Sequence, residues 1–195
     1  SGTAGFSAAP LAVGVRTDKH LYGVEATAKV EVTAVLADGG PAAGRAGVVT
    51  TSLVRDEAGP AGGPEERFLG SYPVTTGPDG RVTLEVPFAE QGRYAVAVAL
   101  PRLATEPAGP PAHAVVHVWV VGDRADVGFS GDHLEVIADR DTYAVGDVAR
   151  LLVLSPVGAR PFLSTVEGAR LLAWDTVALG GTVARGAAHV VEVKV

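Results

Sequence analysis

The sequence contains no cysteine and no methionine among its 195 residues. Without cysteine the chain has no disulfides, no thiolate metal ligands and no cysteine nucleophile. Because translation begins with methionine, a chain that opens Ser1-Gly2-Thr3 is expected to be processed or to be a fragment of a longer protein. No run approaches the ~20 apolar residues of a membrane helix, which argues against a spanning segment.

Aromatic residues are scarce at 6%, and positive charge is outweighed, so that the formal net charge is −6 at pH 7. Such a chain offers no cationic surface to attract nucleic acid or anionic lipid. We therefore expect no nucleic-acid partner and no membrane contact by this chain. The basic residues are almost all arginine, and together with the excess of Ala, Gly, Val and Pro this favours a bacterial source of high GC content.

What the sequence does have is glycine and proline, 25 and 13 of them, spread between short valine-rich segments. Apolar and polar residues alternate in these segments, which is typical of half-buried strands, and no segment shows helical periodicity. Strands are predicted at residues 11–16, 28–35, 48–55, 67–75, 81–86, 92–98 and 114–121. The Gly/Pro-rich region 56–66 is predicted to be a loop. Seven strands in about 110 residues fit one immunoglobulin-like sandwich.

The domain organisation follows from this count. Residues 1–122 are predicted to form the first β-sandwich domain, and the polar, glycine-rich residues 123–132 a linker. Residues 133–195 are predicted to form a second sandwich with about five strands, at 134–138, 149–155, 161–166, 170–178 and 188–195. The predicted fold class is all-β, with two tandem immunoglobulin/fibronectin-III-like antiparallel β-sandwiches. The second sandwich is two strands short and is expected to be truncated.

An internal repeat at an offset of 121 residues supports two copies of one unit. It aligns residues 15–29 with residues 136–150, so that Asp, Lys or Arg, Tyr, Val and Ala recur in the same order. We interpret each copy as a strand, an Asp-basic pair that starts a turn, and a tyrosine that packs over the corner with its hydroxyl free to bind a partner.

This repeated motif resembles the opening of macroglobulin domains in bacterial alpha-2-macroglobulins. The second copy is the better match, from Asp139-Arg140-Asp141-Thr142-Tyr143 through Gly146-Asp147, followed by Ser155-Pro156 and by residues 164–167. The first copy lacks the Pro-Gly pair of the family, and Val145 replaces the usual proline. The thioester motif of the family needs a cysteine, so covalent trapping is not expected in this chain.

The resemblance implies a scaffold fragment of a broad-spectrum protease inhibitor, in which the whole protein traps proteases. It also implies a secreted, periplasmic or cell-surface location, with an envelope-anchored parent. The implied partners are other domains of that parent and, through the whole protein, proteases. Two alternatives stay open: a generic immunoglobulin-like adhesion or surface-display module, and an accessory module of a secreted enzyme.

No candidate site in the sequence is strong, and we expect no catalytic, cofactor-binding or metal-binding residue. The five histidines are His20, His113, His117, His133 and His189. Only His113 and His117 are close, about 13 Å apart on one face of a strand, and catalytic zinc needs three converging ligands. We interpret the histidines as solvated.

Other candidates have plainer explanations too. Five acids crowd the expected linker and could bind calcium, but their spacing fits no EF-hand loop. They are Asp123, Asp126, Asp132, Asp139 and Asp141. Trp119 lies in a run that is apolar on both faces and is expected in a core, whereas Trp174 fits a core or a recognition surface equally. No serine-hydrolase elbow and no nucleotide-binding loop is present.

Overall fold

The computed structural model of this chain describes residues 10–58, 64–106, 110–122, 132–156, 161–167, 171–177 and 187–195. Within these ranges the chain forms thirteen strands and no helix, so no helix there could cross a membrane. The strands are β1 (Leu11–Thr17), β2 (Leu21–Gly23), β3 (Thr27–Leu36), β4 (Ala46–Ala58), β5 (Pro64–Thr75), β6 (Arg81–Pro87), β7 (Gly92–Leu100), β8 (Ala112–Val121), β9 (Glu135–Ala138), β10 (Val148–Ser155), β11 (Phe162–Glu167), β12 (Leu171–Val177) and β13 (Ala187–Lys194). The predicted all-β fold is confirmed.

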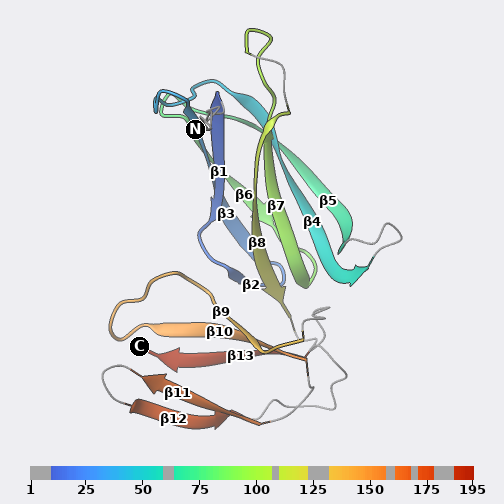
Figure 1. Cartoon of the computed structure of the whole chain (residues 1–195). Coiled ribbons are helices and arrows are strands. Elements are labelled where there is room, and N and C mark those ends of the chain that lie inside the picture. The colour runs from blue at the N-terminus through green and yellow to red at the C-terminus, as the bar shows by residue number, and fades with distance from the viewer. Residues whose placement is uncertain are drawn as a thin grey trace, which may run out of the picture.

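Strands β1 to β8, here called the N-terminal unit, form two sheets around one apolar core (Figure 1). The first sheet has the order β1-β3-β6 and is antiparallel. The second has the order β2-β8-β7-β4-β5, in which only the β2–β8 pair is parallel. In β3 the residues Ala28, Val30, Val32 and Ala34 are at most 1% exposed, while the residues between them face solvent. Facing sheets with this alternation form a β-sandwich.

Three aromatic rings fill one end of this core. The ring of Phe88 lies between those of Tyr22 and Tyr94, with centroid distances of 5.1 and 4.7 Å. All three side chains are buried. Such tilted and edge-to-face contacts add a little to the stabilisation that burial provides. These three aromatic residues thus help to hold the two sheets together.

All seven strands predicted before residue 122 are present, with ends that shift by a few residues. The predicted loop at 56–66 is wrong at both its ends, because β4 continues to Ala58 and β5 begins at Pro64, which pair with each other. Backbone pairing needs no apolar side chain, so a polar Gly/Pro composition conceals it. Residues 59–63 lie outside the described ranges. Strand β2, which is three residues long, was not predicted from the sequence.

Strands β9 to β13, here called the C-terminal unit, form an antiparallel sheet of order β13-β10-β9 and a separate hairpin, β11-β12. All five strands predicted here are present. The middle strand is buried on both faces, since Leu152, Val153 and Leu154 are at most 2% exposed. Of the predicted linker, only Asp132 is among the described residues.

Candidate functional site at the junction of the two units

The repeated motif builds a hydrogen-bonded corner in the N-terminal unit. Oδ1 of Asp18 accepts hydrogen bonds from the hydroxyl of Tyr22 (2.9 Å) and from the backbone N–H of Lys29 (2.8 Å). The tyrosine oxygen in turn accepts a hydrogen bond from the N–H of Lys19 (3.0 Å). One carboxylate oxygen therefore fastens the turn after β1 to the start of β3. Burial and this carboxylate together raise the pKa of Tyr22, so its hydroxyl stays protonated and donates.

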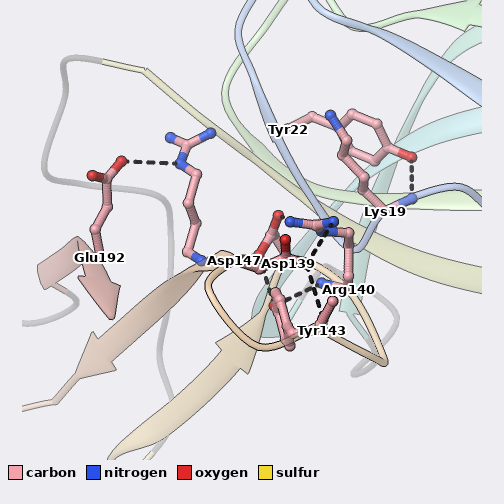
Figure 2. A network of polar contacts seen from close by, with 9 residues as sticks. Lys19, Tyr22, Asp139, Arg140, Tyr143, Asp147 and Glu192 are labelled. Atoms are coloured by element: carbon pink, nitrogen blue, oxygen red, sulfur yellow. Dashed lines mark hydrogen bonds and ion pairs between the residues drawn. The ribbon is translucent and has the colours of Figure 1, made fainter. Parts of the chain in front are cut away.

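The C-terminal unit builds the same corner with the residues 121 positions later (Figure 2). Oδ1 of Asp139 accepts hydrogen bonds from the hydroxyl of Tyr143 (2.7 Å) and the N–H of Arg150 (2.9 Å), and the tyrosine oxygen accepts one from Arg140 N–H (3.1 Å). The guanidinium of Arg140 also lies over the Tyr143 ring, 5.0 Å from its centroid. The predicted role of the Asp-basic pair and the tyrosine is confirmed in both copies.

The carboxylate of Asp139 is buried, with 8% of its side chain exposed, and it stays ionised. Burial alone raises its pKa, but the hydrogen bonds from Tyr143 and Arg150 and the nearby Arg140 guanidinium outweigh burial and lower it below 3.8. The nearest contact of that guanidinium is Nε, 3.5 Å from Oδ2. A charge at this position stabilises the folded unit.

His20 connects the corners of the two units. Its backbone N–H donates to the carbonyl of Asp139 (2.8 Å), and its own carbonyl accepts from the N–H of Trp119 in β8 (2.9 Å). Nε2 of its ring lies 2.8 Å from Oδ1 of Asp141, the residue at the equivalent position of the second copy. A backbone hydrogen bond, from His20 N–H to the carbonyl of Asp139, therefore joins the two units in addition to the chain that links them.

An apolar cluster surrounds this connection. Leu21 and Trp119 of the N-terminal unit pack with Leu152 and Leu154 of the C-terminal unit, and all four are at most 6% exposed. Val121, Ile137 and Ala188 border the cluster. Figure 1 shows β2 and the end of β8 directed toward β9 and β10. Burial of four large side chains makes this a packed contact between the units.

The cluster lies between outward faces of two sheets, not inside either sandwich. Leu21 and Trp119 alternate with Tyr22 and Val120, which point into the core of the N-terminal unit. The repeat equivalents of Leu152 and Leu154 are Glu31 and Thr33, and both belong to the solvent face of β3. The outward face is thus apolar in β10, which docks onto the N-terminal unit, and polar in the equivalent strand β3.

A cleft of about 280 Å³ opens beside the cluster. Its lining is of mixed charge, with His20, Arg93, His117, Trp119, Glu135 and Ile137. Within the described residues there is no group of three His, Asp or Glu side chains placed to hold a metal ion. The cleft contains no nucleophile paired with a base, so we assign it no chemistry.

No family model and no curated protein matches this chain. Among solved structures, it is similar to the alpha-2-macroglobulin of E. coli in its native conformation, with 15% identity, a TM-score of 0.42, and coverage of 95% of this chain and 13% of that one. It is also similar to Salmonella alpha-2-macroglobulin reacted with methylamine, with 14% identity, a TM-score of 0.45, and coverage of 95% and 12%.

A third solved structure is the CARDB domain of a Pyrococcus furiosus protein in complex with di-metal ions. It has 18% identity and a TM-score of 0.35, and the match covers 58% of this chain and 94% of that domain. The chain spans about an eighth of the length of the two macroglobulins, at 13% and 12%. These are partial likenesses of fold, and none assigns a function to the chain.

The prediction that all five histidines are solvated is wrong for two of them. His20 is held in the junction, and His189 in β13 is half-buried, with Nε2 buried and without a hydrogen-bond partner among the described residues. Burial lowers the pKa of His189. His189 pairs with Val153 and shares one face of β13 with Val191 and Val193, so a polar residue lies where alternation favours an apolar one. His113 and His117 are exposed on β8, and His133 is exposed beside Asp132.

Two of the five acids considered for calcium, Asp123 and Asp126, lie outside the described residues. Asp139 has the turn role predicted for it. Trp119 is buried as predicted, although in the junction and not in a sandwich core, whereas Trp174 is 68% exposed. The sequence did contain a signal for the junction, since residues 151–154 read Leu-Leu-Val-Leu without alternation. A strand that is apolar on both faces needs a partner on each face.

Proposed function

We propose that this chain is a structural segment of a larger macroglobulin-like protein. Residues 1–122 and 133–195 are two tandem β-sandwich domains joined by the linker 123–132, and they are held in one fixed orientation. The observation that carries this proposal is the junction, where outward faces of both units are apolar and packed and a backbone N–H of one unit donates to a carbonyl of the other. Independent modules on a flexible tether have no reason to bury such faces.

A fixed pair of sandwiches suits the role of a frame. In a protein that traps a protease, cleavage of one segment has to become a change of shape elsewhere, and rigid bodies transmit such a change. We therefore propose protease trapping as the activity of the whole protein, in a secreted, periplasmic or cell-surface setting. This part of the proposal is supported by the macroglobulin-like motif and by the identical corners it builds around Asp18 and Asp139.

The junction is tested by its effect across the unit boundary. Replacing Leu21, which is 1% exposed, with serine removes apolar contact from the cluster at the N-terminal side only. Loss of a buried leucine costs about 2–4 kcal/mol. If the units form one body, amides of β10 in the C-terminal unit exchange with solvent at least ~10-fold faster in Leu21→Ser, because each ~1.4 kcal/mol is a factor of ten.

The matched control is Val115→Ser, also an apolar residue of the outward face in the N-terminal unit, but 43% exposed and outside the cluster. It is expected to leave β10 exchange unchanged. If β10 exchanges equally in wild type, Leu21→Ser and Val115→Ser, the units are independent and the proposed frame is refuted.

The activity is tested separately by incubating the chain with several proteases. We expect no inhibition by this segment alone, because the proposed trapping belongs to the whole protein. Stoichiometric inhibition by this chain would overturn its assignment as a frame segment. The parent protein, expressed with the sequence that flanks this segment in its gene, is expected to inhibit.

A further inference from the structure

Five strands of the N-terminal unit, β1, β3, β4, β5 and β6, have counterparts in the C-terminal unit. The sheets β1-β3-β6 and β9-β10-β13 have the same order, and β4-β5 and β11-β12 are hairpins at the same place along the chain. β7 and β8 have no counterpart among the described residues of the C-terminal unit.

The match extends to the last residue, because Val195 takes the place of Phe88. Each of the two residues donates its N–H to one carbonyl of the preceding corner and accepts from one N–H there. These four hydrogen bonds are Phe88 N–H to Ala26 O (2.9 Å), Glu25 N–H to Phe88 O (2.8 Å), Val195 N–H to Asp147 O (2.9 Å) and Gly146 N–H to Val195 O (2.8 Å). In the N-terminal unit, β7 begins four residues after Phe88.

In the N-terminal unit the β7–β8 pair completes the second sheet. β7 pairs along the edge of β4 that is turned away from β5, from Val48 opposite Ala99 to Val54 opposite Arg93. The inward side chains of the pair are at most 1% exposed and make up much of the core. They are Tyr94, Val96, Val98, Leu100, Val118 and Val120.

In the C-terminal unit the edge of β11 that corresponds to this edge of β4 pairs with no described strand. Two large apolar side chains of the hairpin are exposed, Leu163 at 65% and Trp174 at 68%. Thr165 pairs with Trp174 and Leu163 with Thr176, so these two apolar side chains share one face of the hairpin. Bare edges and exposed apolar side chains in a sheet favour pairing with a further strand.

The corner of the C-terminal unit also lacks a strand to pair with. In the N-terminal unit, residues Leu21–Gly23 form β2 because they pair in parallel with β8. Their counterparts, residues 142–144, keep every hydrogen bond of the corner yet form no strand. Val24 is 37% exposed beside β8, whereas its counterpart Val145 is 97% exposed. The corner is built to receive an outer strand that the described residues do not supply.

We propose that the C-terminal unit binds a two-stranded antiparallel segment with the sequence pattern of β7–β8, presented from the Val195 side. The first strand of the segment pairs along the free edge of β11, and the second pairs in parallel with residues 142–144. The segment presents Tyr and Val at alternate positions of one face, as β7 and β8 do. This inference does not depend on the proposed frame function, because it rests on the edge of β11 and on the pairing of residues 142–144, and not on the apolar cluster between the units.

The test joins a copy of residues 89–121 directly after Val195 of the full chain. The control carries the same copy with its inward Tyr94, Val96 and Val98 replaced by serine. The readouts are hydrogen exchange at amides of β11 and of residues 142–144, and molecular mass by light scattering. We expect the first graft to slow exchange at both places by at least ~100-fold relative to the control graft, in a monomer.

Equal exchange in both grafts would overturn the proposal. Protection of β11 in the unmodified chain together with a dimeric mass would also overturn it, and would assign the edge to a second copy. If the grafted chain does not fold, residues 89–121 are added as a separate peptide to the unmodified chain, and the side-chain NMR signals of Tyr143 and Trp174 are followed. A saturating shift of the Tyr143 signal supports the proposal, and no shift up to the solubility limit of the peptide contradicts it.

Discussion

Replacing Asp139 with alanine removes the acceptor of two hydrogen bonds, from the Tyr143 hydroxyl and from the Arg150 N–H. Hydrogen bonds to a charged group contribute about 1.5–3 kcal/mol each. Because Tyr143 is only half-buried, water replaces part of its bond, and we expect a total loss of about 3 kcal/mol. Asp139→Asn keeps an acceptor oxygen and loses only the charge, so its expected cost is about 1 kcal/mol.

The pH dependence of stability distinguishes these two losses. The pKa of Asp139 is lowered on folding, so its charge contributes stability above the unfolded value of about 3.9, and that stability is lost as the pH falls through the folded pKa. Urea unfolding of the C-terminal unit, followed by hydrogen exchange of β10, measures the free energy at pH 7 and at pH 3. Asp139→Asn is expected to weaken the acid destabilisation. A cost below 1 kcal/mol for Asp139→Ala, or an acid profile of Asp139→Asn identical to wild type, would refute the role given to the corner.

Three further substitutions follow from the comparison of the copies. Glu25 has φ 66°, in the left-handed region that disfavours side chains, where the second copy has Gly146 at φ 94°. Calorimetry should show Glu25→Gly stabilising the N-terminal unit and Gly146→Ala destabilising the C-terminal unit, each by about 1 kcal/mol, and equal effects of the same sign would contradict this. His189 stands where the N-terminal unit has Val82, since Val153 and Val32 are their partners. His189→Val should stabilise by about 1 kcal/mol and abolish the loss of stability that a lowered histidine pKa causes below pH 6.5, as titration of the melting temperature would show.

Much of the fold was predictable from the sequence, because alternation marks strands and Gly/Pro marks turns. The Asp-Tyr corner was also predictable, since both copies carry it and a turn needs an acceptor beside the tyrosine. The junction was not predicted. Leu152 and Leu154 read as core residues of their own sandwich, and the polar residues at the equivalent positions, Glu31 and Thr33, indicate that this face is an outward one. β2 was missed because three residues carry no periodicity, and its existence depends on pairing with residues 98 positions later in the chain.

The fixed orientation of the two units is the central claim, and one distance distribution tests it. The chain has no cysteine, so Thr83→Cys and Thr165→Cys attach one spin label to an exposed position of each unit. Double electron–electron resonance is expected to give a single narrow distance distribution, which broadens when Leu152→Ser is added to disrupt the apolar cluster. A broad distribution before that substitution would contradict the claim.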